Sequence, residues 1–186
     1  NNHGQIYSGR GLEFDGVVDS LTTGYVASAD GISTNATVVC WVNIDDITVD
    51  DWIWNFYADG SNEWGLRVGE TSGKIQIEDN SGAGGLARYA TTILGDNWYR
   101  IVVVLDDNEQ KLYLNGILVG SGTDMHEAAG LNNFTSTLYI GSRESTTNFL
   151  GGKMSNFQIW DAAFSADDVT YDYLNPEQLA LNRGGT

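Results

Sequence analysis

Carboxylates are the side chains through which this sequence could do chemistry, because it contains 25 Asp and Glu residues. A retaining glycoside hydrolase needs two carboxyl groups about 5 Å apart, one as acid and one as nucleophile. The stretch 74–79 supplies Glu78 and Asp79, but neighbouring residues of a strand point to opposite faces. The same-face positions before Glu78 hold Gln76 and Lys74. The sequence therefore predicts a protein that is not an enzyme.

The sequence also offers few residues for nucleophilic catalysis or zinc binding. The two histidines, His3 and His126, fall in a probable tail and in a polar stretch. The single cysteine, Cys40, lies in the apolar run 38–42, where a small buried hydrophobe is expected. One cysteine and two distant histidines exclude a structural zinc site, and one cysteine excludes an internal disulfide.

The composition indicates one globular domain with an acidic surface. The chain has 186 residues, 41% of them hydrophobic, and a formal net charge of −16. Nucleic acid is excluded as a direct partner, because phosphate contacts need clustered Lys and Arg. No apolar run is long enough to cross a bilayer, so membrane insertion is not expected. We expect an N-terminal tail over 1–8, a domain over 9–174, and a tail or linker over 175–186.

Short apolar runs recur between clusters of Gly, Asn, Asp and Ser, which is typical of an all-β protein. Strands are predicted over 12–14, 37–44, 53–57, 64–68, 74–78, 98–105, 111–114, 117–120, 137–141 and 154–160. So many strands in one chain predict a two-sheet antiparallel jelly-roll sandwich. The runs 38–42 and 101–105 are apolar on both faces, which places them inside the sandwich.

Two local sequence signals predict a turn and a helix within this strand pattern. Asn115-Gly116 stands between two apolar runs and predicts a tight hairpin. Ser165, followed by Asp167 and Asp168, has the pattern of a helix N-cap with acidic residues in the first turn. One short helix is therefore predicted near the C-terminus.

Four motifs give the chain a family resemblance. They lie at 11–16 (Gly-Leu-Glu-Phe-Asp-Gly), at 37–42 (Thr-Val-Val-Cys-Trp-Val), at 97–104 followed by 111–116, and at 151–161 followed by 164–169. In order and spacing they resemble the laminin-G-like and pentraxin-like domains of the concanavalin A-like lectin/glucanase superfamily. The C-terminal stretch 171–183 resembles the tails of lectin-like modules in virion proteins of marine tailed phages.

The resemblance implies that one structural calcium ion could be bound. The loop that is acidic in pentraxins reads Ser142-Arg143-Glu144-Ser145 here, so the double calcium site of pentraxins is not expected. A different site could form from oxygen ligands where the terminal strands meet or in a loop. The candidate ligands are Asp15, Gly16, Asp161 and Asp59. The alternative is that these are solvated turn residues, which Asp favours for backbone reasons.

Sugar binding would use exposed aromatic rings together with polar side chains. Strand alternation predicts Trp52, Trp54 and Phe56 on one face, and Ile53, Asn55 and Tyr57 on the other. Three tryptophans, Trp41, Trp98 and Trp160, are predicted to lie in the core. The candidate ligand-binding residues are Trp54, Trp64, Asn62, Arg88, Tyr89 and Arg143.

Taken with the resemblance, these features predict a non-catalytic module that binds carbohydrate. Its partner would be a glycan or cell-surface polysaccharide, and other subunits of a larger assembly are further possible partners. The expected location is extracellular or on a virion surface. One alternative is a structural or assembly domain of a phage particle without a sugar site. The other, a glycoside hydrolase, lacks the required carboxylate pattern.

Overall fold

The computed structural model describes residues 5–7, 11–30, 32, 34–59, 62–69, 73–81, 86–107, 109–122, 135 and 137–175. Within these ranges, the side chains of residues 5–7, 62, 80, 81 and 86–90 are not described.

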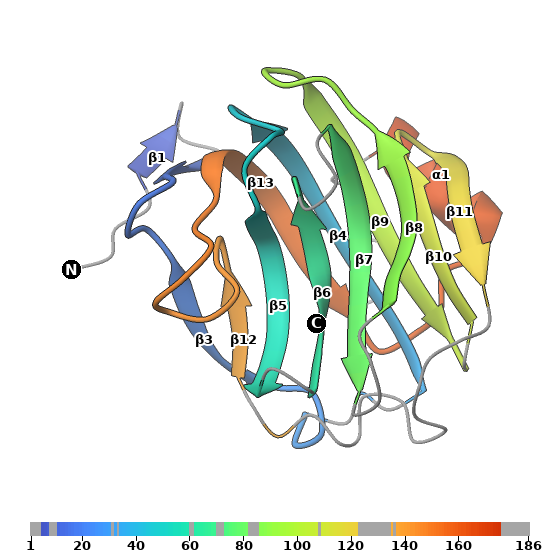
Figure 1. Ribbon diagram of the computed structural model, residues 1–186. Helices are drawn as coiled ribbons and strands as arrows, with labels where there is room; N and C mark the ends of the chain where they lie inside the picture. Colours follow the sequence, from blue (N-terminus) through green and yellow to red (C-terminus); the bar gives the residue numbers. More distant parts are fainter. Residues whose placement is uncertain are drawn as a thin grey trace.

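Two antiparallel sheets stack face to face and form the predicted sandwich (Figure 1). The seven-stranded sheet runs in the order β1 (Gln5–Tyr7), β2 (Gly11–Asp15), β13 (Gly151–Trp160), β4 (Asn35–Ile44), β9 (Trp98–Asp106), β10 (Glu109–Leu114) and β11 (Ile117–Gly122). The six-stranded sheet runs in the order β3 (Leu21–Val26), β12 (Thr137–Ile140), β5 (Asp51–Asp59), β6 (Asn62–Val68), β7 (Lys74–Ser81) and β8 (Leu86–Thr92). The prediction of an all-β jelly-roll sandwich is confirmed.

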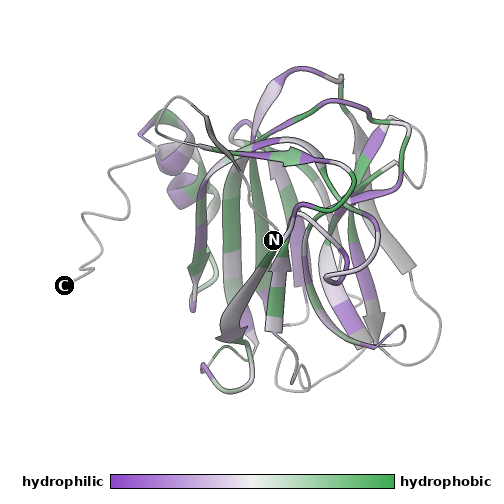
Figure 2. Ribbon diagram, turned by 90° about the vertical axis from the view of Figure 1, so that its left-hand side faces the viewer, coloured by the Kyte–Doolittle hydropathy of each residue, from purple (hydrophilic) through white to green (hydrophobic). Residues whose placement is uncertain are grey.

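The main core lies between the sheets, and a smaller one lies outside the seven-stranded sheet. Val38, Ile101 and Val103 point into the main core. Their strand neighbours Val39 and Val102 point outward, into the smaller core beneath the helix. Figure 2 shows the helix lying outside one sheet of the sandwich. The central strands β4 and β9 are therefore apolar on both faces because both faces are covered.

The helix α1 (Ala166–Leu174) begins at the predicted N-cap. Ser165 and Asp168 form a capping box, in which each side chain accepts a hydrogen bond from the other's backbone N–H. Asp172 is fully buried and accepts two hydrogen bonds of 2.7 Å from Nε and Nη2 of Arg100, on the outer face of β9. This ion pair fixes the helix against the seven-stranded sheet. No helix among the described residues is long and apolar enough to cross a membrane.

Other local predictions have mixed outcomes. The Asn115-Gly116 hairpin is present, with both residues at positive φ (52° and 81°). Cys40 is buried as expected, and burial raises the pKa of its thiol to about 12. The prediction that Trp98 is a core residue is wrong, since 42% of it is exposed. It shares the outer face of β9 with Arg100 but stands at the strand's first residue, where the helix does not cover it.

The two other predicted core tryptophans are only partly buried, because both lie on the helix side of the seven-stranded sheet. Trp41 lies 6.1 Å from the ring of Tyr173 in α1, measured between ring centroids. Trp160 packs on Phe164, with 5.4 Å between the centroids. Both contribute to helix docking rather than to the core between the sheets.

Candidate functional site

A β-bulge in β5 decides which aromatic rings reach the outer face of the six-stranded sheet. Trp52 pairs with Arg67 and Trp54 pairs with Leu66, so Ile53 is an extra residue without a partner in β6. The bulge interrupts the alternation and moves Trp52 to the face opposite that of Trp54. The prediction that these two rings share a face is therefore wrong. Trp52 lies on the outer face, above Gly65 of β6.

The predicted ligand-binding tryptophans Trp54 and Trp64 lie in the main core instead. Both side chains have 0% exposure, and their ring centroids are 4.8 Å apart in an edge-to-face arrangement. The indole N–H of Trp64 donates to Oε1 of Gln110 across the sandwich. Neither ring can stack on a ligand, because each fills space between the sheets. This finding corrects the prediction for both residues.

Arg143 is the predicted ligand residue that the structure does place at a polar site. Its guanidinium donates from Nε to Oε2 of Glu63 (2.9 Å) and from Nη2 to Oε1 (2.6 Å). Asn55 donates from Nδ2 to Oε2 of the same carboxylate and to the carbonyl oxygen of Arg143, at 3.0 Å each. Glu63 raises the pKa of Arg143 above its usual range, so the guanidinium stays charged.

Two arginines enclose Trp52 in this cluster. The guanidinium carbon of Arg67 lies 5.3 Å from the centroid of the Trp52 ring, and that of Arg143 lies 5.9 Å away. Arg67 is itself paired with Asp50 (2.9 Å) and with Glu78 (3.4 Å). Cation–π contacts and ion pairs together hold both guanidinium groups in fixed positions. We call Trp52, Asn55, Tyr57, Glu63, Arg67 and Arg143 the Arg143 cluster.

Gly65 makes room for the cluster at the centre of the sheet. A Cβ atom there would lie 2.7 Å from Cζ3 of Trp52, 2.7 Å from Oδ1 of Asn55 and 2.5 Å from the carbonyl oxygen of Trp54. Any side chain at position 65 would therefore displace Trp52 or Asn55. The glycine lets the indole ring lie directly on the sheet.

Part of the cluster faces solvent. The guanidinium carbon of Arg143 lies 5.4 Å from the ring centroid of Tyr57, which is partly exposed, and the Arg143 side chain is 31% exposed. Nη1 of Arg143 makes no hydrogen bond with any residue that the structure describes. Partial burial, with Glu144 nearby, raises the pKa of Tyr57, so its hydroxyl remains a neutral donor and acceptor. The arrangement offers a partly exposed aromatic ring beside a fixed cationic donor.

Two buried acceptors next to Arg143 are unmatched by the described residues. Oδ1 of Asn55 and Oγ of Ser142 have no hydrogen-bond partner there, although both residues are fully buried. Buried polar atoms of this kind are usually satisfied by water or by a ligand.

Two carboxylates on the outer face of the six-stranded sheet, those of Glu63 and Glu78, are each engaged by an arginine. Glu78 faces Arg67, whereas Asp79 points inward and accepts from Nε2 of Gln110, as alternation predicted. Glu63, on the neighbouring strand, is held by Arg143. A hydrolase needs one carboxyl group free to donate a proton and another free to attack. Neither Glu63 nor Glu78 is free in this way.

The residues predicted to bind calcium do not come together. Asp15 pairs with Gly151 at the start of β13, whereas Asp161 follows the last residue of that strand. At about 3.3 Å per residue, these positions are roughly 30 Å apart. Asp59 is also distant from Asp15. The first residue of β5, Asp51, lies beside the start of β13, where it accepts a 3.2 Å hydrogen bond from the N–H of Gly151, whereas Asp59 is the last residue of β5. The expectation of a shared site for Asp15, Gly16 and Asp161 is therefore wrong.

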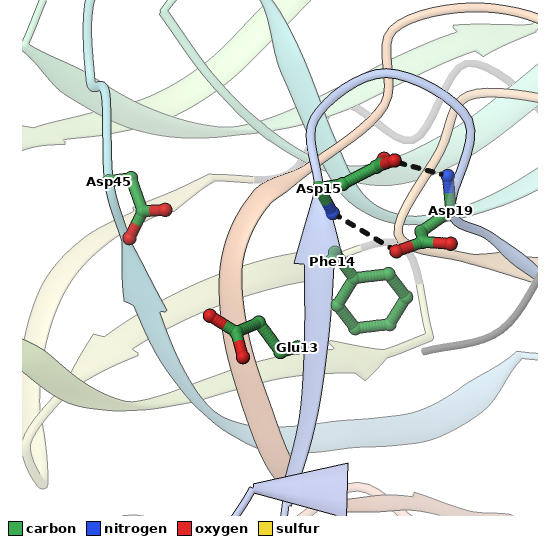
Figure 3. A pocket seen from close by; sticks show the side chains of 5 residues that line it. All are labelled: Glu13, Phe14, Asp15, Asp19 and Asp45. Atoms are coloured by element: carbon green, nitrogen blue, oxygen red, sulfur yellow. Dashed lines mark hydrogen bonds between the residues drawn. The ribbon is translucent and has the colours of Figure 1, made fainter. Parts of the chain in front are cut away.

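Asp15 instead organises its own turn. Its Oδ1 accepts hydrogen bonds from the backbone N–H groups of Val17, Val18 and Asp19, which lowers the pKa of Asp15. Figure 3 shows the two hydrogen bonds between Asp15 and Asp19, each from the backbone N–H of one residue to the carboxylate of the other. Both residues line a pocket of about 290 Å³. Its lining also includes Glu13, Phe14 and Asp45. No group of three His, Cys, Asp or Glu among the described residues is arranged to hold a metal ion.

The remaining predicted site residues cannot be placed. The side chains of Asn62, Arg88 and Tyr89 lie outside the described part of the structure, as do His3 and His126. Sequence reasoning missed Glu63, Arg67 and Trp52 as members of one cluster. No sequence pattern predicts the bulge at Ile53, which brings Trp52 to this face.

Comparison with known proteins agrees with the geometry. A laminin G model, described as the concanavalin A-like lectin/glucanases superfamily, matches residues 15–170. The chain belongs to this superfamily. No curated protein matches the sequence significantly.

Solved structures of the same fold include modules that bind sugars. A heptameric SAP-like pentraxin from Limulus polyphemus has a TM-score of 0.67 at 15% identity, over 88% of this chain and 81% of that one. Domain 4 of AbnA, an arabinanase from Geobacillus stearothermophilus solved with arabinotriose, has a TM-score of 0.64 at 19% identity, over 74% and 66%. The CBM40 of a Ruminococcus gnavus sialidase, bound to α2,3-sialyllactose, has a TM-score of 0.60 at 15% identity, over 86% and 96%. At these identities, the likeness establishes that the superfamily fold is shared.

Proposed function

We propose that this domain is a non-catalytic carbohydrate-binding module that works as part of a larger extracellular protein. The observation that carries the proposal is the fixed guanidinium of Arg143. It is held by buried Glu63 and lies against the partly exposed ring of Tyr57. The ligand is expected to stack on Tyr57 and to accept a hydrogen bond from Nη1 of Arg143.

The chemistry of the cluster suits a sugar. A pyranose or furanose presents C–H groups on one face, which pack on an aromatic ring, and hydroxyl groups at its edge, which need paired donors and acceptors. The Arg143 cluster supplies both within one surface. Because the guanidinium and the ring are already in place, little conformational entropy is lost when the ligand binds.

The non-catalytic part of the proposal rests on the outer-face carboxylates. Glu63 and Glu78 each face an arginine, which occupies oxygens of the carboxylate. A carboxyl group engaged in this way is not free to donate a proton to a leaving group or to attack a sugar. We therefore expect no cleavage of any glycan that the domain binds.

A structural or assembly module, such as a decoration or fibre domain of a phage particle, is the second candidate. The observation that favours it is a group of exposed apolar side chains at one end of the sandwich, which includes Leu94, Trp98 and Ile117. Surfaces of this kind often mark contacts with other proteins. The two candidate functions are compatible if the outer face of the six-stranded sheet binds glycan while the end that carries the exposed apolar residues is attached to an assembly.

A thermal-shift panel tests the carbohydrate proposal. The domain is melted with arabinotriose, with α2,3-sialyllactose and with a set of marine and bacterial polysaccharides, each with calcium and with chelator. A ligand at one hundred times its Kd stabilises the native state by about 2.7 kcal/mol, which is readily seen as a rise in Tm. Tyr57→Ala should abolish the rise, whereas Tyr171→Ala, which alters an exposed tyrosine of α1, should retain it. Melting that no glycan shifts would contradict the proposal.

A further inference from the structure

One end of the sandwich carries a group of exposed large hydrophobic residues. Of the nine such residues in the described part of the chain, seven lie there, and the other two, Tyr171 and Leu174, lie on α1. The seven are Val17, Val18, Val49, Leu94, Trp98, Ile117 and Leu118, and we call them the apolar end. Their exposed fractions range from 42% for Trp98 to 68% for Ile117. A group of exposed apolar residues of this kind often marks a contact with another protein.

Backbone hydrogen bonds bring the loops of the apolar end together. The turn after β2 is joined to the start of β13 by Gly16 N–H donating to the carbonyl oxygen of Leu150 (3.0 Å). Asp45, after β4, donates to the carbonyl oxygen of Gly151 (2.9 Å). Asp96, before β9, donates to the carbonyl oxygen of Ile44 at the end of β4 (2.8 Å). Figure 1 shows the loops after β4 and after β8 and the β10–β11 hairpin at the same, upper end of the molecule.

Three of the loops at this end combine exposed apolar residues with aspartates. Val17 and Val18 stand between Asp15 and Asp19 in the run 15–19. In the run 45–49, the exposed Val49 follows the exposed Asp45 and Asp46. In the run 94–98, an exposed aspartate lies between Leu94 and Trp98. The pocket lined by Glu13, Asp15, Asp19 and Asp45 adds negative charge at the same end.

We propose that the apolar end is a docking surface for a basic amphipathic segment of a partner protein. Apolar side chains of the partner would pack on Trp98, Leu94 and Ile117, and its lysines or arginines would face the aspartates. A second copy of the chain fits poorly, because it would bring like charges together. An anionic membrane is disfavoured for the same reason. An exposed tryptophan beside aliphatic residues is the kind of anchor on which binding energy concentrates.

The proposal is tested with a synthetic 14-residue peptide in which leucines and lysines give a basic amphipathic helix. Two peptides serve as comparisons: one has serine at every leucine position, and one has glutamate at every lysine position. Binding is followed by the anisotropy of labelled peptide at physiological salt, on the full chain. The test variant is Leu94→Ser/Trp98→Ser. The matched control is Tyr171→Ser/Leu174→Ser, which removes the two exposed apolar residues outside the apolar end.

The proposal expects the wild-type chain to bind the leucine–lysine peptide at least tenfold more tightly than either comparison peptide. The test variant should lose at least tenfold in affinity, and the control should stay within twofold of wild type. Equal binding by wild type and the test variant would overturn the proposal, because it would show attraction by net charge alone. Stronger binding of the domain to phosphatidylserine vesicles than to the peptide would overturn it in favour of a membrane. Tyr57→Ala should leave peptide binding unchanged, so this test is independent of the glycan site.

Discussion

Arg143, in the loop after β12, and Glu63, in β6, form a two-hydrogen-bond ion pair on the outer face of the six-stranded sheet. The side chain of Glu63 is 2% exposed, and the side chain of Arg143 is 31% exposed. The pair therefore joins a loop far along the chain to the centre of the sheet, with its charge turned partly toward solvent. The contacts that position this loop also fix the guanidinium group that we assign to ligand binding.

Removing the carboxylate should loosen this loop. Glu63→Gln keeps the shape of the side chain but loses the charge that orients Arg143. We expect the free energy of unfolding to fall by about 2 kcal/mol, less than for a fully buried pair, because Arg143 remains partly hydrated. Glu109→Gln, at the more exposed pair with Lys111, should change it by less than about 0.5 kcal/mol. Urea unfolding of both variants measures the difference, and equal effects would contradict this account of the Arg143 loop.

The second arginine pair, Arg100 with Asp172, should matter more for stability. Both side chains have 0% exposure, so Asp172→Asn leaves a buried guanidinium without its counter-charge. We expect a loss of about 3–5 kcal/mol in the free energy of unfolding. The double variant Arg100→Met/Asp172→Leu should recover most of that loss, because it removes both charges. A double variant no more stable than Asp172→Asn in chemical denaturation would show that the pair itself stabilises helix docking.

Asp51 gives the domain a pH dependence with a defined sign. Burial raises the pKa of Asp51 from 3.8 to about 6, so the folded state holds its proton more tightly than the unfolded state. The stabilisation that this residue contributes is complete below about pH 3.8 and is lost as the pH rises through about 6. Asp51→Asn keeps an acceptor oxygen for the N–H of Gly151 but cannot ionise.

We therefore expect Asp51→Asn to be more stable than wild type at pH 7–8 and nearly equal to it at pH 4. Thermal melts of the two proteins across this range measure the difference. A difference that stays constant from pH 4 to pH 8 would contradict the assignment.

Gly65 tests the packing of Trp52 on the sheet. Gly65→Ala places a Cβ within 2.7 Å of Trp52 and Asn55, and we expect a cost of about 1–3 kcal/mol with a displaced indole ring. Gly24→Ala, in β3, meets no atom within 4 Å and should be neutral or slightly stabilising. Urea unfolding and near-ultraviolet circular dichroism measure both effects. Unaltered tryptophan signals in Gly65→Ala would show that the ring does not rest on the glycine.

The fold was predictable because its signals are local and repeated. The alternation in 111–114, the turn at Asn115-Gly116 and the capping residue Ser165 all appear in the structure as expected. The runs 38–42 and 101–105 are central strands, as predicted, but only one face of each lies between the sheets, and the other packs in the smaller core beneath the helix. Each of these patterns involves residues that are close together in the sequence, so it can be recognised in a single sequence.

The site was predictable only in part, because it depends on a bulge and on long-range pairing. Strict alternation put Trp52 beside Trp54, and the extra residue Ile53 reversed that relation. The partner of Arg143 is Glu63, 80 positions away, and nothing in either segment indicates the other. The expectation that Asp15 and Asp161 lie close together was wrong for a similar reason, since they adjoin opposite ends of β13.

The most direct test of the central claim is a calorimetric titration of the purified domain with the glycan that raises its Tm most. Wild type, Tyr57→Ala, Arg143→Ala and the control Tyr171→Ala are titrated under the same conditions. The account predicts that Tyr57→Ala and Arg143→Ala each weaken binding at least tenfold, whereas Tyr171→Ala binds as wild type does. Wild-type affinity in both site variants, or the absence of any glycan that binds, would contradict it.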